Sequence, residues 1–417
     1  KVLNEPVNPY KPHVLQRYID AEVFYAMQEE LWKCKGFYSV VRSTRDYLTP
    51  VGANFLGYIS EVNKSDIAAS GGYYRQGDLI GTTGLERYYE PFLRGKKGVK
   101  MILADVKQRE IGPFAGGKFD TIPEKGEDIM ISVDAELQLL GELLLKNKKG
   151  SLVAIEPRTG EVLAFCSSPT YDPNSLIGLQ FAKNWRALQR DTLKPLFNRP
   201  MMATYPPGSI FKITNALVGL QEGIITPKST YYNPGYFNRN PTGRPRDHAP
   251  PGTYNVFRAI QLSSNVFFAN LYIDIMHADK YEDVREGYNT WREYMLKFGI
   301  GRELNIDIPN EKKGFIPTDK YYDRLYGDGR WRGMTIVSNS IGQGEVLMTP
   351  LQMANTAAVV ANKGWYIEPH FFRRLYNSAL DTTIQFERVE TGIAKEHFDL
   401  AANAMQQVVE AGTAVLA

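Results

Sequence analysis

The sequence of 417 residues is poor in the side chains that build metal sites and disulfide frameworks. It holds two cysteines, Cys34 and Cys166, without a C-x-x-C pair, and five histidines without an H-E-x-x-H motif. Structural zinc sites and metalloprotease sites need such residues at fixed spacing, so we predict no metal and no cofactor. A single Cys34–Cys166 bridge remains open at this point.

A strong charge excess and a long apolar run are also missing. The 49 Lys and Arg residues against 46 Asp and Glu give a net charge of +3, so nucleic-acid binding is not expected. No stretch approaches the roughly 18 consecutive apolar residues of a membrane-spanning helix. Because the sequence begins at Lys1 without a signal segment, we expect a targeting region upstream in a longer protein.

The composition is that of a globular protein, and the length suits two or three domains. Residues 1–128 are rich in Gly, Tyr and charged side chains, whereas regular helix and strand patterns begin at residue 129. The Gly- and Pro-rich stretch 113–127 predicts a linker. We therefore predict one domain over residues 1–128 and a second over residues 129–417.

Local patterns predict several elements. Alternating apolar residues predict strands within 51–62, and Thr83 with Glu86 predicts a capping box before a helix over 85–94 that Pro91 interrupts. In the second domain, the predicted elements are a helix behind Asp134 up to Asn147, a hairpin of 151–156 with 161–165, and helices over 211–221, 266–276 and 349–361.

The segment 205–212 (YPPGSIFK) carries the first chemical signal. Ser209 opens a predicted helix, and Lys212 lies three residues later on the same face. Free backbone N–H groups at a helix start can donate to an oxyanion. The predicted apolar face of this helix consists of Ile210, Ile213, Leu217 and Leu220.

A lysine at this position can activate the serine only if its pKa is low. An ordinary lysine, with a pKa near 10.4, is neutral in about one molecule in 2,500 at pH 7. Burial among apolar residues disfavours the ammonium, and a pKa of roughly 7 to 8 would suit a general base. Without this context, a Ser-x-x-Lys pair of two common residues arises by chance.

The tripeptide Ser263-Ser264-Asn265 follows Lys212 along the chain. Ser263 and Asn265 cannot share a helix face at this spacing, so we place them on a turn that leads into the helix over 266–276. From there a hydroxyl and an amide could point into one cleft. The alternative is that one of these residues only caps the helix.

Two other polar segments are interpreted as structural. Residues 338–345 form a Gly-rich turn without the spacing and lysine of a phosphate loop. Asp247 and His248 lie among prolines, which indicates an exposed loop.

Residues 205–212 and 263–265 resemble the first two active-site motifs of penicillin-binding proteins, Y-P-P-G-S-x-F-K and S-x-N. Further similarity covers most of residues 45–370: the G-x-x-G-L-E box at 81–95, the strand-turn-strand segment at 151–174 and the I-G-Q-G run at 341–355. The sequence is identified as a member of the class B enzymes, and it most resembles their elongation-type transpeptidases, the penicillin-binding protein 2 group.

The resemblance implies an α+β protein in which a non-catalytic pedestal of the dimerisation type precedes a penicillin-binding transpeptidase domain. That domain would have a central antiparallel sheet flanked by helices, as in serine β-lactamases. The implied activity is a peptidoglycan D,D-transpeptidase that cross-links stem peptides ending in D-Ala-D-Ala during cell elongation and shape maintenance. β-Lactam antibiotics would acylate it. A single N-terminal anchor would hold it in the cytoplasmic membrane with the catalytic domain in the periplasm, beside a membrane glycan polymerase and rod-shape scaffold proteins.

The resemblance also implies residue roles. Ser209 would attack the carbonyl of the penultimate D-alanine, and an amine of a neighbouring strand would resolve the acyl-enzyme. Lys212 would be the base, Ser263 would relay a proton to the leaving group, and Asn265 would orient Lys212 and the substrate amide. The positions assigned to substrate binding are Gly208 and Ser264.

The sequence departs from the family at its third motif, because no K-[T/S]-G triplet occurs. In the family the triplet follows a stretch similar to residues 408–414. Its strand supplies one oxyanion donor, whose loss typically costs about 2.7–4 kcal/mol of transition-state stabilisation, so a chain without it is expected to be badly impaired. Residues 1–10 resemble the segment after the anchor, but Lys11 onward resembles a region well downstream. We therefore expect the sequence to join pieces of a longer protein.

Two other functions remain open from the sequence. A D,D-carboxypeptidase or β-lactamase-like hydrolase would use the same serine with water as the acceptor. A non-catalytic assembly module would bind cell-wall machinery and form no covalent adduct with a β-lactam.

Overall fold

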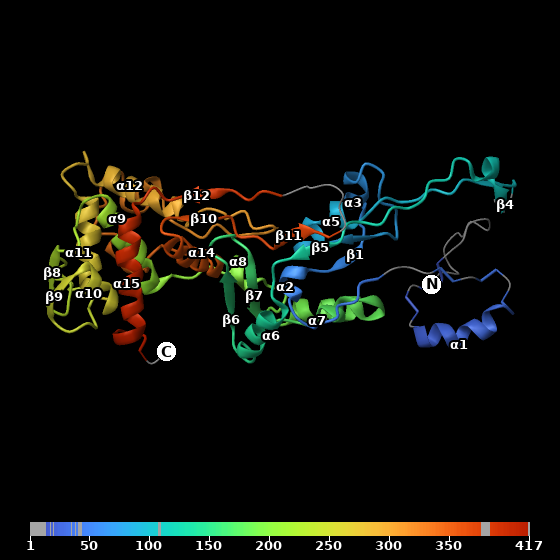
Figure 1. Ribbon diagram of the computed structural model, residues 1–417, viewed down its shortest axis with the longest axis horizontal. Coiled ribbons are helices and arrows are strands. Elements are labelled where there is room, and N and C mark those ends of the chain that lie inside the picture. Colours follow the sequence, from blue (N-terminus) through green and yellow to red (C-terminus); the bar gives the residue numbers. More distant parts are fainter. Residues whose placement is uncertain are drawn as a thin grey trace. The chain divides into compact units, whose positions relative to one another are not determined.

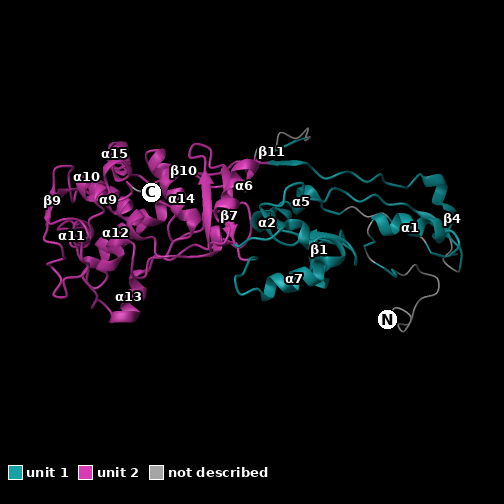
Figure 2. Ribbon diagram, turned by 90° about the horizontal axis from the view of Figure 1, so that it is seen from below, with its two compact units in different colours: residues 1–130, 169–196, 374–382 teal, residues 131–168, 197–373, 383–417 magenta. Residues whose placement is uncertain are grey.

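The computed structural model describes residues 14–415 except 17, 20, 35, 38, 41–43, 107–109 and 377–383. The chain divides into two compact units (Figure 2), with unit 1 formed by residues 1–130, 169–196 and 374–382 and unit 2 by the remainder. The sequence placed the division after residue 128 and assigned 169–196 to the second domain. The segment Lys1–Tyr10, which carried one part of the family resemblance, lies outside the described residues.

Unit 1 is built from short helices and antiparallel strand pairs, β1 with β2 and β3 with β4. Its elements are α1 (Ala21–Leu31), α2 (Ala53–Leu56), β1 (Ile59–Glu61), α3 (Lys64–Ala69), β2 (Leu79–Gly81), α4 (Gly84–Tyr88), α5 (Glu90–Leu93), β3 (Ile102–Ala104), β4 (Glu110–Pro113), η2 (Phe114–Gly117), η3 (Pro173–Leu176), η4 (Gly178–Gln180) and α7 (Phe181–Arg190).

Residues 169–196 belong to unit 1 because their polar and aromatic side chains contact α2 and the residue between α2 and β1, Tyr58. Thr170 Oγ1 bonds Asn54 Oδ1 at 2.9 Å, and Trp185 Nε1 donates to the hydroxyl of Tyr58 at 3.2 Å. The ring of Phe181 lies 5.6 Å from that of Tyr58. These contacts join residues more than a hundred positions apart, which local patterns in the sequence do not reveal.

The predicted linker 113–127 is wrong. Thr121 and Glu124 pair with Val99 and Lys96 in antiparallel bridges, so the segment is folded back on unit 1. A Cβ at Gly126 would lie 2.1 Å from the carbonyl oxygen of Leu93. Glycine is present here because two backbones approach closely, which composition alone cannot distinguish from flexibility.

The helix predicted over 85–94 is divided, as Pro91 indicated. α4 ends at Tyr88, and α5 starts anew with Pro91 in its first turn. The predicted capping box is wrong, because the side chain of Thr83 makes no cap bond. Glu86 is instead held by Arg45 through two hydrogen bonds of 2.6 and 2.7 Å. The first part of 51–62 is also helical (α2), and only its second part forms the predicted strand, β1.

Unit 2 contains the segments with the chemical motifs. Its elements are α6 (Ala135–Leu144), β6 (Gly150–Ile155), β7 (Val162–Ser168), α8 (Arg199–Met202), η5 (Gly208–Ile210), α9 (Phe211–Gln221), β8 (Thr230–Asn233), β9 (Gly252–Asn255), α10 (Val256–Gln261), α11 (Asn265–Met276), α12 (Val284–Lys297), α13 (Asp319–Tyr326), η6 (Val337–Ile341), α14 (Pro350–Ala361), β10 (Trp365–Ile367), β12 (Arg388–Glu390) and α15 (Lys395–Ala411). The division between the units falls within β5 (Ile129–Ile131) and β11 (Phe372–Leu375).

The predicted hairpin is confirmed, and helices cover both of its faces. β6 and β7 pair antiparallel from Gly150 with Ser168 to Ile155 with Val162. Successive strand residues point to opposite faces. Cys166 lies against Gly141 of α6, whereas the hydroxyl of Ser167 accepts a bond from the amide of Arg199 on α8. Figure 1 shows α6 and α8 beside this hairpin.

The centre of unit 2 is a group of buried helices. Residues 211–220 of α9 are all buried, and so are all residues of 266–276 in α11 except Asp274. α9 contacts α11, α12 and α15 (Figure 1). A helix that is buried on every side is held rigidly by its neighbours, which suits a helix that carries functional side chains at its start. The structure records no disulfide at Cys34, which is exposed and free, or at Cys166, which is buried and free.

Candidate functional site

Ser209 lies on a tight turn at the start of α9. Two prolines precede it, Gly208 has a φ of 64°, and the turn η5 leads directly into the helix. A left-handed conformation at Gly208 costs little because glycine has no Cβ. Ser209 is exposed there, while the rest of the helix is buried. Ile210 was predicted on the buried face but is 46% exposed, because it belongs to the turn rather than to α9.

The Gly-rich turn 338–345 lies directly behind this segment. The amide of Gly208 donates to the carbonyl of Gly342 at 2.9 Å. A Cβ on Gly342 would lie 2.3 Å from the carbonyl oxygen of Gly208, so only glycine fits. From the sequence we interpreted residues 338–345 as structural. In the structure this turn supports the turn that carries Ser209.

Asn215 connects α9 to two further elements. Its side-chain Nδ2 donates to the carbonyl of Ser340 at 2.8 Å, and its Oδ1 accepts from Trp291 Nε1 at 2.7 Å. The Asn215 side chain is fully buried, and a buried amide with both ends bonded fixes its neighbours in one arrangement. Sequence reasoning missed Asn215, since a polar residue inside an apolar helix gives no sign of its partners.

Lys212 is buried in the first turn of α9, with 2% of its surface exposed. Its Nζ lies 2.5 Å from the carbonyl of Ser263, 3.0 Å from the hydroxyl of Ser263 and 2.7 Å from Asn265 Oδ1. An ammonium has three donors, so these acceptors satisfy its protonated form. Residues predicted from two separate motifs therefore meet around one amine.

Burial lowers the pKa of Lys212 to about 8, although the negative charge of Asp247 opposes this shift. Desolvation disfavours the charged amine because a polar environment stabilises charge better than apolar packing does. At neutral pH about one molecule in ten then carries the neutral amine, compared with one in about 2,500 for an ordinary lysine. That population is sufficient for a general base.

The turn 263–265 joins the end of one helix to the start of the next. The amide of Ser263 donates to the carbonyl of Ile260 at 3.0 Å, and that of Ser264 donates to Ala259 at 2.9 Å. This pair of bonds is the Schellman ending of a helix, in which the residue after the C-cap is left-handed and usually glycine. Here that residue is Ser263, with a φ of 52°. In this conformation, the backbone carbonyl and the hydroxyl of Ser263 both accept a hydrogen bond from Nζ of Lys212.

Both interpretations of the tripeptide apply, but to different residues. Ser264 caps α11 by accepting from the amide of Phe267 at 3.2 Å, whereas its neighbours Ser263 and Asn265 reach Lys212. Ser264 was predicted to bind substrate, and this assignment stays a prediction. Its side chain is fully buried and its hydroxyl also donates to Asp247.

The interpretation of Asp247 as part of an exposed loop is also wrong. Its side chain is fully buried, while that of His248 is 53% exposed. Asp247 Oδ2 accepts from the hydroxyl of Ser264 at 2.6 Å and from the amide of Val266 at 2.9 Å. The surrounding prolines shape the loop that carries this buried carboxylate. A proline-rich composition taken alone suggests an exposed loop instead.

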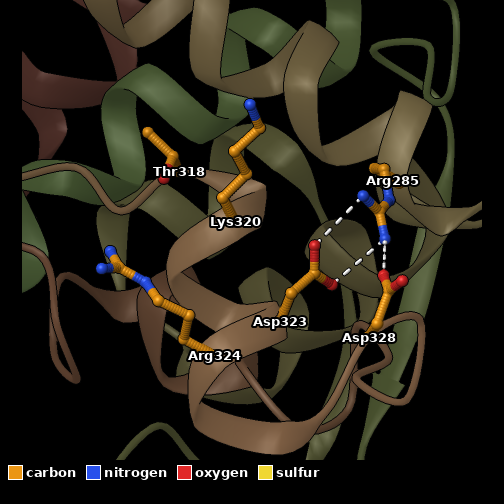
Figure 3. A pocket seen from close by; sticks show the side chains of 6 residues that line it. All are labelled: Arg285, Thr318, Lys320, Asp323, Arg324 and Asp328. Carbon is orange, nitrogen blue, oxygen red and sulfur yellow. Dashed lines mark hydrogen bonds and ion pairs between the residues drawn. The ribbon is translucent and has the colours of Figure 1, made fainter.

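A hollow on unit 2 lies away from these residues and has a structural explanation. Arg285 forms ion pairs with Asp323 and Asp328 there (Figure 3). Thr318 caps α13 by accepting from the amide of Tyr321. None of the residues around Ser209 and Lys212 lines this hollow. Its carboxylates are neutralised by an arginine, so it offers no nucleophile with an adjacent base.

Within the described ranges, no three His, Cys, Asp or Glu side chains lie together as ligands of a metal ion would. No helix of those residues combines the length and apolar character needed to cross a membrane.

Comparison with known proteins agrees with this geometry. Residues 150–417 match the family described as penicillin binding protein transpeptidase domain, and residues 1–131 match the penicillin-binding protein dimerisation domain. The peptidoglycan D,D-transpeptidase MrdA of Acinetobacter baumannii is 31% identical over 87% of this chain and 52% of its own length. MrdA of Escherichia coli is 32% identical over 76% of this chain and 48% of its own. The chain thus spans about half the length of these curated relatives.

Solved structures are similar as well. A complex between PBP2 and MreC from Helicobacter pylori has a TM-score of 0.78 at 25% identity and covers 93% of this chain and 69% of that one. PBP2 of Pseudomonas aeruginosa in complex with WCK 5153 has a TM-score of 0.68 at 29% identity and covers 88% and 76%. A structure described as showing coordination of polymerization and crosslinking by a peptidoglycan synthase complex has a TM-score of 0.76 at 26% identity, with 97% and 69% covered.

Proposed function

This chain belongs to the penicillin-binding protein transpeptidase family, and we propose that it is a serine D,D-transpeptidase that cross-links peptidoglycan stem peptides. The observation that carries this proposal is the buried amine of Lys212. It lies three residues from an exposed serine on a rigid helix start and is bonded to both functional residues of the second motif.

The proposed reaction begins when neutral Lys212 takes the proton of the Ser209 hydroxyl. The oxygen attacks the carbonyl carbon of the penultimate D-alanine, and the bond to the terminal D-alanine breaks as its nitrogen gains a proton. The hydroxyl of Ser263 relays that proton from Lys212, which it contacts at 3.0 Å. A penicillin reacts in the same way, but its leaving nitrogen stays attached through the opened ring.

Asn265 and Gly208 have supporting roles in this proposal. Asn265 Oδ1 holds the amine of Lys212 in place, and in this proposal the same side chain orients a substrate amide. Gly208 keeps the backbone beside Ser209 open, since a Cβ there would have only Gln343 Nε2 nearby, at 4.0 Å. Substrate backbone can therefore approach Gly208 closely.

We place this activity in cell elongation and shape maintenance because the relatives are named MrdA and PBP2. The similar structure with MreC and the similar synthase complex support two partners, a rod-shape scaffold protein and a membrane glycan polymerase. The location follows from the substrate, since the peptidoglycan lies outside the cytoplasmic membrane. We propose an N-terminal membrane anchor with the catalytic domain in the periplasm.

The reaction products of the full-length protein test the activity. Incubation with glycan strands whose stem peptides end in D-Ala-D-Ala should yield cross-linked dimers and one free D-alanine per cross-link. Free D-alanine without dimers would indicate a carboxypeptidase, and rapid hydrolysis of penicillin would indicate a β-lactamase. The absence of any product or adduct would leave a non-catalytic assembly module.

A further inference from the structure

Asp247 is a buried charge beside the second motif that the proposed reaction does not use. It lies on the loop between β8 and β9, and its side chain is fully buried. Oδ1 accepts from the amide of Ala249 at 3.0 Å, and Oδ2 accepts from Ser264 Oγ and Val266 N. An isolated buried carboxylate is costly, so these three donors account for its stability in this position.

Arg246, the residue before Asp247, binds the second motif through a separate hydrogen bond with Asn265. The carbonyl of Arg246 accepts from Asn265 Nδ2 at 2.9 Å, which leaves Oδ1 of the same amide facing Lys212 Nζ at 2.7 Å. This bond decides which end of the amide meets the amine. Two consecutive loop residues, Arg246 and Asp247, thus bind Ser264, Asn265 and Val266.

We propose that Asp247 is a positioning residue for the acylation step, holding the turn that carries Ser263 and Asn265 against Lys212. This inference rests on the proposed function. The carboxylate never touches the reacting atoms, and it acts through the Ser264 hydroxyl and the Val266 amide. Its charge has a second consequence, because it favours the protonated amine of Lys212 and so raises the pKa that burial has lowered.

Charged and titratable groups face Asp247 from α9, from its own loop and from β9. Lys212 lies on α9, and His248 on the same loop has its Nδ1 3.9 Å from Asp247 Oδ1. Tyr254 on β9 has a pKa raised by burial and by the charge of Asp247. His248→Gln is therefore included as a control for the ring beside Asp247.

The test measures the rate of acylation by a penicillin across about pH 6 to pH 10, with full-length protein and intact-mass detection. Asp247→Asn keeps an acceptor for Ser264 and Val266 but removes the charge. The plateau rate should fall roughly tenfold as the turn loosens. The midpoint of the rise in rate should move to lower pH, because the amine of Lys212 loses a stabilising negative charge.

Ser264→Ala tests the positioning effect of Asp247 without removing its charge. It removes the hydroxyl that Asp247 holds but leaves the carboxylate, so the plateau rate should fall while the midpoint stays at its wild-type pH. His248→Gln should leave both quantities unchanged. A matched structural control is Asp307→Asn, since Asp307 is also fully buried and accepts from two backbone amides, those of Phe371 and Phe372. It should lower the thermal stability without moving the midpoint.

The outcomes distinguish this inference from the proposed function. If wild-type protein is acylated but Asp247→Asn keeps the wild-type midpoint and a rate within about twofold, the positioning role is wrong. A midpoint that moves in His248→Gln would show that the midpoint does not report the effect of Asp247 on Lys212, and it would also overturn the positioning role. If Asp247→Asn does not fold, an unchanged rate in Ser264→Ala overturns the inference. Absence of acylation in the wild type contradicts the proposed function instead.

Discussion

The amide of Gly208 donates a hydrogen bond of 2.9 Å to the carbonyl of Gly342, and this contact joins the turn of Ser209 to a loop far along the chain. Gly342 has a φ of 67° and sits so close to Gly208 that no side chain fits between them. The backbone behind the serine is therefore fixed from two directions, by the start of α9 and by this loop. Rigid backing of this kind preorganises a nucleophile.

Gly342→Ala tests this backing. The added Cβ would lie 2.3 Å from the carbonyl oxygen of Gly208, in a left-handed conformation that alanine disfavours. We expect a loss of roughly 2–4 kcal/mol in the free energy of unfolding and slower acylation. Gly223→Ala is the control, because Gly223 has a φ of 68° but open space around it. It should cost about 1 kcal/mol and leave acylation unchanged, as measured by denaturant unfolding and penicillin binding.

Ser263 occupies a position where glycine is usually found, so its two substitutions should separate stability from activity. Ser263→Gly relieves the left-handed backbone, with a φ of 52°, and should stabilise the fold by up to about 1 kcal/mol. Ser263→Ala keeps the strain. Both remove the hydroxyl bonded to Lys212, and both should slow acylation by about a hundredfold or more. Equal stability of the two variants would contradict the strain assigned to Ser263.

The acylation rate should rise as Lys212 loses its proton. With its pKa lowered to about 8 by burial, the neutral amine increases as the pH rises through that value. The rate should therefore increase about tenfold from pH 7 to a plateau above roughly pH 9. Lys212→Arg should show no such rise, since a guanidinium stays charged. A wild-type rate that is flat over this range would exclude Lys212 as the base.

The same low pKa makes stability depend on pH. The pKa of Lys212 is about 8 in the folded protein, compared with its ordinary value of 10.5 in the unfolded chain, so the unfolded chain binds more protons between these values. Stability must then rise with pH over this window. Relative to Lys212→Met, wild type should gain roughly 3 kcal/mol in the free energy of unfolding from about pH 7 to pH 10.5. Denaturant unfolding at several pH values measures the difference, and parallel curves for the two proteins would contradict it.

The sequence predicts the helices and hairpin of unit 2 well because their patterns are local. α9, α11 and α14 begin within one residue of their predicted starts, and Thr349 caps α14 in a capping box with Gln352. Ser209, Lys212, Ser263 and Asn265 were also predicted from two short motifs, and the structure gathers the last three around one amine. Their catalytic roles remain predictions.

Long-range partners explain what the sequence could not reveal. Asp247 looks exposed among prolines until its contacts with Ser264 and Val266 are known. Gly126 looks like part of a linker until the backbone of Leu93 is seen beside it. Glu86 fits a capping box in sequence, but Arg45 forms a stronger, charge-assisted pair with it. In each case the local sequence fits two interpretations equally well, and only the tertiary contacts show which one is correct.

The intact mass of the protein before and after incubation with a penicillin tests the central claim most directly. Wild-type protein should gain the mass of one penicillin, and Ser209→Ala should gain none, because the acyl bond forms on the Ser209 hydroxyl. Ser209→Ala keeps the buried Lys212 and the turn 263–265, so it should remain folded. An adduct that persists in Ser209→Ala, or a wild-type protein that gains no mass, would contradict the assignment of Ser209 as the nucleophile.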